Sequence, residues 1–314
     1  MFAVTIVEAK LEWKEHPDLR PGGGEVVVNV RAAGVNAADL MQREGRYPAP
    51  PGAPADIPGL EFAGEVTAVG DGVTRVAVGD RVMGINGGGS QAEQVVVAAG
   101  TVLRVPEGIP WDQAGGFPEA FFTACDALFS QGGVTAGERV LISGAAGGVG
   151  TAAVQLAHAA GAHVVASVRS EERRAEVGAL GADTVIDPSE VAEHGPYDVS
   201  LELVGGQAIA DVLPYLAVGG RVVVIGVMAG AKIELNLLKL MASRSTIGGS
   251  MLRSRTIAEK SEVTDVVANR VLPLLAKGDV VVPVAERFPM ADAVQAYERF
   301  SAGGKFGKVV LIND

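Results

Sequence analysis

The alternation of hydrophobic and polar positions differs between successive parts of the chain. Up to about residue 115, short valine-rich runs alternate partly with polar residues, and Gly, Pro and Asp separate the runs. These runs occupy residues 25–35, 64–70, 79–85 and 92–100. They predict a barrel-like antiparallel fold for this part of the chain, in which the proline-rich residues 46–59 form an irregular loop.

From about residue 118 the pattern becomes a succession of strands and helices. We predict strands at 139–144, 163–168, 184–187, 198–204 and 221–226, and helices at 148–162, 170–182 and 206–217. Strands that alternate with helices in this way are typical of an α/β protein with a parallel, doubly wound sheet. The last part of the chain is mixed, with helices predicted at 258–278 and 290–303 and strands at 279–288 and 307–313.

The sequence GAAGGVG at 144–150 lies between a predicted strand and a predicted helix. Gly144, Gly147 and Gly150 are spaced three residues apart. A pyrophosphate at a helix N-terminus needs free N–H donors and close backbone approach, and side chains would block both. A tight strand-to-helix turn is the alternative, but the alternating units that follow favour a dinucleotide-binding loop.

The end of the next predicted strand indicates which dinucleotide is bound. An NAD site commonly has an acidic residue there, which accepts a hydrogen bond from the ribose 2′-hydroxyl. Here Arg169 holds that position, Ser170 follows, and Arg173 lies one helical turn further. Guanidinium groups and a hydroxyl suit a 2′-phosphate, so the sequence favours NADPH. The alternatives are a solvated helix start with internal ion pairs, or Glu171 serving an NAD ribose.

Composition and charge narrow the functional class. The chain has 314 residues, of which 48% are hydrophobic, enough for more than one domain with a sizeable core. Its net charge of −11 argues against a general nucleic-acid or anionic-membrane partner. The single cysteine, Cys125, cannot form an intrachain disulfide, which fits a reducing cytoplasm. We expect neither a signal peptide nor a membrane span, because the apolar runs are short and interrupted by glycine.

Six segments carry a family resemblance: GVNAADLMQREGRYP (34–48), PGLEFAGEVTAVG (58–70), GDRVMGI (79–85), PEAFFTACDAL (118–128), GAAGGVGTAAVQLA (144–157) and SMLRSR (250–255). Together they resemble the medium-chain dehydrogenase/reductase superfamily, and most of all its zinc-free, zeta-crystallin-like quinone oxidoreductase branch. The first and last segments are most similar to the stress-induced quinone oxidoreductases of animals and their bacterial relatives.

The resemblance implies a GroES-like β-barrel catalytic domain made from both chain ends, residues 1–117 and 256–314. A Rossmann domain that binds NADPH would be inserted at residues 118–255. The family commonly forms homodimers through the edge strands of two Rossmann sheets, and STIGGSM (245–251) is at the matching position.

The resemblance also bears on metal binding. Zinc-dependent members of the superfamily have Cys where this chain has Asn36 and His where it has Leu60. An amide and an aliphatic side chain cannot replace the thiolate and imidazole that tetrahedral zinc prefers. We therefore expect no metal, and we interpret Glu61, which the zinc enzymes also carry, as a structural group or a polar wall of the pocket.

The resemblance assigns further roles. Asn36 and Tyr47 are expected to line the cleft near the nicotinamide, where each has a polar group that can act on the acceptor, and Thr123 is expected near the nicotinamide ribose and ring. Ordinary loop or helix packing is the alternative for these three residues. The expected cofactor-binding residues are Gly144, Ala146, Gly147, Gly148, Val149, Gly150, Arg169, Ser170, Arg173, Gly205, Gly226, Val227, Met228, Ser250, Met251, Leu252, Phe306 and Lys308. The quinone oxidoreductase branch often has a Tyr at the position that Pro188 occupies in this chain.

These features predict an oxidoreductase that reduces quinones with NADPH, by direct hydride transfer and without a metal. A reductase of enones, 2-alkenals or enoyl thioesters on the same scaffold is the alternative within the same class. A cofactor-binding structural protein or an RNA-binding protein is the alternative from another class, and the acidic charge argues against RNA.

Overall fold

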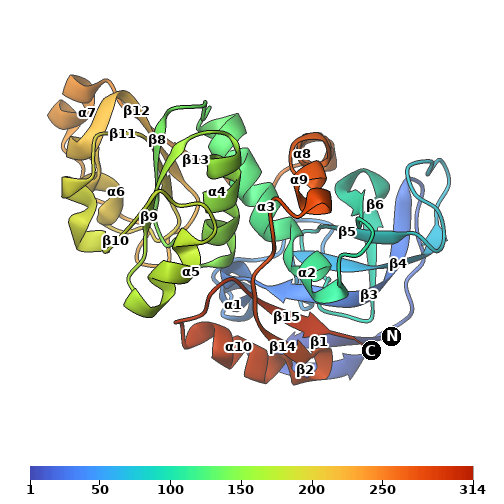
Figure 1. The fold of residues 1–314 in the computed structure, drawn as a ribbon. Coiled ribbons are helices and arrows are strands. Elements are labelled where there is room, and N and C mark those ends of the chain that lie inside the picture. Colours follow the sequence, from blue (N-terminus) through green and yellow to red (C-terminus); the bar gives the residue numbers. More distant parts are fainter. Residues whose placement is uncertain (314) are drawn as a thin grey trace. The chain divides into compact units, whose positions relative to one another are not determined.

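The computed structural model describes residues 1–313, which divide into two units. Unit 2 is the contiguous segment Thr123–Met251, whereas unit 1 combines residues 1–122 with the chain from Leu252 onward. Figure 1 shows blue and red segments, from the two ends of the chain, in the same sheet of unit 1. The first structural boundary lies five residues after the predicted one at 117, and the second lies four residues before the predicted one at 255.

Unit 1 is built around a seven-stranded sheet. Its strands follow the order β14 (Val284–Pro289), β15 (Lys308–Ile312), β3 (Glu25–Val35), β4 (Glu61–Val69), β5 (Arg81–Ile85) and β7 (Val102–Arg104), and β6 (Gln94–Ala98) pairs with β3. Only β14 and β15 run parallel to each other; the remaining pairs are antiparallel. The C-terminal strand β15 therefore lies inside the sheet, with Val309 opposite Val35.

A separate antiparallel hairpin of unit 1 consists of β1 (Phe2–Val7) and β2 (Lys10–Glu15). Its turn residues, Glu8 and Ala9, have positive φ angles of 48° and 62°, as a two-residue hairpin turn with the twist of the strands requires. The sequence analysis did not predict this hairpin, because the turn lacks the usual Asn or Gly.

The helices of unit 1 pack around this sheet. They are α1 (Ala37–Arg43), α2 (Trp111–Gly116), α3 (Pro118–Cys125), which continues into unit 2, α8 (Ile257–Arg270), α9 (Leu272–Lys277) and α10 (Ala293–Ser301). The core includes Val26, Val28 and Val30, which alternate along β3, together with Phe62 and Tyr297. Burial of each such side chain contributes roughly 1.5–3 kcal/mol. Within residues 1–313, no helix combines the length and the hydropathy needed to cross a bilayer.

Unit 2 contains a six-stranded sheet whose strands are all parallel. The order is β10 (Thr184–Ile186), β9 (His163–Ser167), β8 (Arg139–Ile142), β11 (Tyr197–Glu202), β12 (Leu216–Val224) and β13 (Thr246–Gly249). The helices are α4 (Gly148–Ala159), α5 (Arg174–Gly178), α6 (Ala208–Asp211) and α7 (Leu237–Ser243), and they cover both faces of the sheet (Figure 1). In chain order the strands run 3-2-1-4-5-6, the Rossmann order, which confirms the predicted doubly wound sheet.

Some predicted elements differ from the observed ones, and proline explains three of the differences. The helix predicted at 206–217 ends at Asp211 and gives way to a single 3₁₀ turn that contains Pro214. The helix predicted at 258–278 is divided into α8 and α9, with Pro273 in the first turn of α9. The strand predicted at 279–288 begins only at Val284, directly after Pro283, which has no N–H to donate.

Candidate active site

The glycine loop of unit 2 leads directly into α4. Gly144 has a φ of +60°, and Gly147 is the N-cap of the helix. The N–H groups of Gly148, Val149 and Gly150, as the first of the helix, have no intrahelical acceptor. A Cβ on Gly150 would lie 2.5 Å from the Gly144 carbonyl oxygen, so only glycine allows the helix to pack this closely on the loop. The loop therefore presents the donors that a pyrophosphate needs.

The loops that follow the strands of unit 2 meet at one edge of its sheet. The Ala145 N–H donates to the Ser167 carbonyl at 3.2 Å, which ties the glycine loop to the end of β9. A Cβ on Gly205 would lie 2.5 Å from Cα of Val227, so the loops after β11 and β12 touch. The Ser250 N–H donates to the Val224 carbonyl at 3.1 Å. The predicted loop residues therefore lie together at the edge where doubly wound sheets bind ligands. The side chains of Met228 and Met251 are exposed at this edge.

Three arginines near the end of β9 have different surroundings. Arg169 is exposed and has no ion-pair partner within residues 1–313, and Ser170 beside it is partly exposed. Arg173 pairs with Glu176 at 3.0 Å. Arg174 pairs with Asp187 at 2.8 Å and donates to the Val168 carbonyl. Arg169 is therefore the guanidinium that is free to bind an added phosphate.

A second group of polar residues lies in unit 1, where β3, β4 and β15 adjoin. The Lys308 ammonium donates to Asn36 Oδ1 at 2.6 Å and to Glu61 Oε1 at 2.5 Å. The Asn36 amide in turn donates to Glu61 Oε1 at 2.8 Å. The Glu61 and Lys308 side chains are almost completely shielded from solvent. These contacts fix the orientation of the Asn36 side chain. Lys308 was expected at the cofactor, and the structure shows its ammonium held inside unit 1.

A buried carboxyl fixes the backbone of Asn36. Asp39 accepts from the Asn36 N–H at 2.8 Å and from the Gly59 N–H at 3.1 Å. Burial raises the pKa of Asp39 to about 6, although these two hydrogen bonds oppose the shift. Asp39 therefore joins the start of α1 to the loop before β4 and acts as a positioning residue.

Arg253 holds Tyr47 in two ways. Its guanidinium lies 4.8 Å from the centroid of the Tyr47 ring, and Nη1 donates to the Tyr47 carbonyl at 2.9 Å. The same guanidinium donates to the Gly87 carbonyl at 2.8 Å and to Gln42 Oε1. Burial raises the pKa of the Tyr47 phenol, so its hydroxyl stays protonated at neutral pH. This hydroxyl has no hydrogen-bond partner in the described part of the chain.

The remaining predicted residues lie in different settings. Thr123 and Cys125 are buried on α3 in unit 2, and Leu252 is buried in unit 1. Phe306 is partly buried in the segment before β15. Sequence reasoning missed Asp39 and Arg253 as positioning residues. Asp39 did have a signal, because Asn-x-x-Asp before an apolar run is a helix-start pattern.

The residues around Asn36 do not fit a zinc ion. Leu60 is buried and apolar, and the Lys308 ammonium already provides the positive charge beside Glu61. Among the residues that the structure describes, no three His, Cys, Asp or Glu side chains are grouped as metal ligands. A dication next to a buried ammonium would be repelled.

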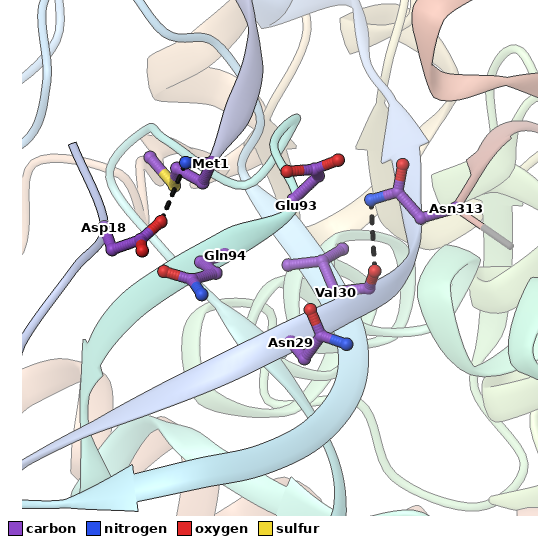
Figure 2. Close-up of a pocket in the computed structure, with 7 residues that line it drawn as sticks. All are labelled: Met1, Asp18, Asn29, Val30, Glu93, Gln94 and Asn313. Carbon is purple, nitrogen blue, oxygen red and sulfur yellow. Dashed lines mark hydrogen bonds and ion pairs between the residues drawn. The ribbon is translucent and has the colours of Figure 1, made fainter. Parts of the chain in front are cut away.

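A hollow of about 300 Å³ in unit 1 lies elsewhere, between the two ends of the chain (Figure 2). Its lining residues are Met1, Asp18, Asn29, Val30, Glu93, Gln94 and Asn313. Asp18 accepts from the Met1 ammonium at 2.8 Å, and Glu93 accepts from the Phe2 N–H at 2.7 Å. The Asn313 amide donates to the Val30 carbonyl. Because the chain's own donors engage both carboxylates, we assign no chemistry to this hollow.

Comparison with known proteins extends the structural observations. Residues 22–107 match the family model described as an alcohol dehydrogenase GroES-like domain, which confirms the predicted class of unit 1. Residues 148–269 match the model described as a zinc-binding dehydrogenase.

Individual relatives match over nearly the whole chain. A quinone oxidoreductase from Rattus norvegicus is 33% identical over 93% of this chain and 90% of its own length. One from Pseudomonas aeruginosa is 32% identical over 96% of this chain and 95% of its own length. A mycobacterial protein solved in complex with NADPH has a TM-score of 0.88 and 28% identity, with complete coverage of both chains.

Proposed function

The chain belongs to the medium-chain dehydrogenase/reductase superfamily, in its quinone oxidoreductase branch, and we propose that it reduces quinones with NADPH, without a metal. One observation carries the choice of cofactor. The open N-terminus of α4 and the unpaired Arg169 adjoin the same sheet edge, where a pyrophosphate and a 2′-phosphate both need partners.

The proposed NADPH-binding residues fall into groups with separate tasks. The backbone of residues 144–150 would hold the pyrophosphate, and Arg169, Ser170 and Arg173 the adenosine 2′-phosphate. The backbone of Gly205, of 226–228 and of 250–252 would hold the nicotinamide half, with Thr123, Phe306 and Lys308 assigned to it by family resemblance. Bound NADPH would supply the hydride, so the protein has to orient the acceptor and stabilise its developing charge.

Asn36 and Tyr47 are the proposed groups for the acceptor. The Tyr47 hydroxyl is protonated, held by Arg253, and without a partner in the described part of the chain, so it is prepared to donate. Asn36 is fixed by Lys308 and Glu61, and an amide nitrogen has a second N–H. Fixed donors stabilise an oxyanion without reorganisation at the moment of reaction.

The Lys308–Glu61 pair supports catalysis without zinc. The experiment is to follow NADPH oxidation with a panel of quinones, enones and enoyl thioesters, before and after exhaustive chelation, with metal analysis of the same sample. We expect quinone-dependent oxidation that survives chelation and well under one zinc per chain. A stoichiometric zinc required for turnover would refute the metal-free proposal. Activity only on enones or enoyl thioesters would support the alternative reductase, and no activity at all would favour a non-enzymatic role.

We also propose a homodimer through β13, the terminal strand of the unit 2 sheet. The neighbouring helix α7 exposes Leu237, Leu238 and Met241, whose side chains are 62%, 75% and 71% exposed. We expect light scattering to show a dimer that Leu238→Glu weakens. Val78→Glu, at a residue of unit 1 that is 62% exposed, is the matched control and should remain dimeric. A monomeric wild type would refute this proposal.

A further inference from the structure

One acid in unit 1 is not used by the function proposed above. Glu119 is the second residue of α3, and its N–H donates to Glu61 Oε2 at 2.8 Å. Glu119 is partly exposed as a residue, and its carboxyl has no hydrogen-bond partner within residues 1–313. Glu119 is therefore anchored by its backbone to the Asn36–Glu61–Lys308 group, while its side chain is free to act.

The charges around this carboxyl come from several elements. They are Glu61 on β4, Asp39 on α1, Lys308 on β15 and Arg253 before α8. Tyr47 and Lys260 on α8 also lie within electrostatic range. Burial, and next the neighbouring Glu61 carboxylate, raise the pKa of Glu119 to about 8, against the opposing effect of Lys308. At neutral pH most Glu119 side chains therefore carry a proton.

We propose that Glu119 is the proton donor of the reaction, a role that rests on the proposed reductase function. The acceptor takes up a hydride, which brings two electrons from NADPH and leaves NADP⁺. The Glu119 O–H bond breaks, and its proton forms an O–H bond on the reduced quinone or a C–H bond at the α-carbon of a reduced enone. The remaining carboxylate recovers a proton from water, which its partial exposure permits.

The neighbouring groups are less suited to this task. Both Asp39 oxygens already accept backbone N–H groups, and the side chain is fully buried. Glu61 is held in its ion pair with Lys308. The Tyr47 pKa lies above its usual value of 10, so its phenol is a hydrogen-bond donor that does not readily release its proton near pH 7. Glu119 alone in this group combines a proton, partial exposure and an unengaged carboxyl.

The first test measures the proton itself. Difference infrared spectra of wild type against Glu119→Gln, without cofactor, should show the C=O band of one protonated carboxyl at pH 7, lost as the pH rises through about 8. Glu107→Gln, at an exposed glutamate of unit 1, is the matched control and should leave that band in place. An ionised Glu119 at pH 7 would overturn the proposal.

The second test separates this role from the function as a whole. Glu119→Gln should keep the NADPH dissociation constant but slow enone reduction about 10²-fold or more and lose the wild-type fall in rate above pH 8. Glu119→Asp, which retains an acid, should recover part of the rate and confirm that folding is intact. Wild-type rates in Glu119→Gln would overturn the proton-donor role and leave the reductase function standing. A wild type that reduces no acceptor would overturn both.

Discussion

The Lys308 ammonium lies 2.5 Å from Oε1 of Glu61, and the two residues are 247 positions apart in the sequence. The Lys308 side chain is 4% exposed and the Glu61 side chain is 0% exposed. The pair joins the C-terminal strand β15 to β4 and also orients Asn36. Taking two charges out of water is costly, so neither residue tolerates loss of the other.

Lys308→Met should lower the free energy of unfolding of unit 1 by about 3–5 kcal/mol, because Glu61 becomes an uncompensated buried charge. Both tryptophans, Trp13 and Trp111, lie in unit 1, so tryptophan fluorescence during urea unfolding reports on that unit. The double variant Lys308→Met/Glu61→Gln should regain much of the loss, since it buries no charge. A loss below about 1 kcal/mol in the single variant would show that the pair behaves like an exposed one.

Arg169→Ala should weaken NADPH binding and leave NADH binding nearly unchanged. A lost charge-assisted hydrogen bond costs about 1.5–3 kcal/mol, or roughly 10- to 150-fold in the dissociation constant. Arg173→Ala is the control, and its effect should be smaller because Arg173 already pairs with Glu176. Titration of the wild type and both variants with each dinucleotide gives the six dissociation constants. Equal affinity of the wild type for NADPH and NADH would contradict the cofactor assignment.

Tyr47→Phe should lower the catalytic rate more than it weakens NADPH binding. One oxyanion donor contributes about 2.7–4 kcal/mol in a closed site, and we expect a smaller loss at a partly exposed tyrosine. The loss should be modest with a quinone, because aromatisation drives its reduction, and larger with an enone. Steady-state kinetics with one acceptor of each kind, beside Tyr215→Phe in unit 2 as control, measures this. Unchanged rates on both acceptors would reduce Tyr47 to a packing residue.

Glu202→Gln should stabilise unit 2 at neutral pH. Glu202 ends β11 with 2% exposure, and its Oε2 has no hydrogen-bond partner within residues 1–313. Burial raises its pKa above the usual 4.5, so the folded state holds the proton more tightly than the unfolded state. Stability is therefore lost as the pH rises from 4.5 through the folded-state pKa.

Glutamine does not titrate, so the variant lacks this dependence of stability on pH. We expect Glu202→Gln to raise the free energy of unfolding by on the order of 1 kcal/mol at pH 8 and by little at pH 4. Amide hydrogen exchange of β8 and β11 reports on unit 2 directly. A gain that is the same at both pH values would show that the effect is not electrostatic.

Local patterns were sufficient to predict much of the fold. The valine-rich run 25–35 coincides with β3, and the glycine loop was correctly placed between a strand and a helix. In these places the sequence neighbours themselves determine the backbone, through period-two alternation and through glycine. Pro214 and Pro273 also indicate the ends of helices, but the predicted helices continue across both prolines because the apolar periodicity does.

The group around Asn36 was not predictable in the same way. Lys308 contacts Asn36 across 272 positions, and Arg253 contacts Gln42 across 211. No local periodicity signals such a contact, which depends on the sheet bringing the two chain ends together. Glu119 shows this clearly, because an acidic residue in the first turn of a helix is common, and only the neighbouring Glu61 and the burial make it unusual.

The interior position of β15 sets an order of events during synthesis on the ribosome. Unit 2 is contiguous, so all its strands have been translated before residue 252 is added. The sheet of unit 1 still lacks both β14 and β15 at that stage, and β15 has to insert between β3 and β14. A chain translated from its N-terminus therefore has the complete sequence of unit 2 while the Glu61 carboxylate still lacks the Lys308 ammonium that pairs with it. The side chain of Asn36, which Glu61 and Lys308 orient together, therefore acquires its fixed position only after β15 has been translated.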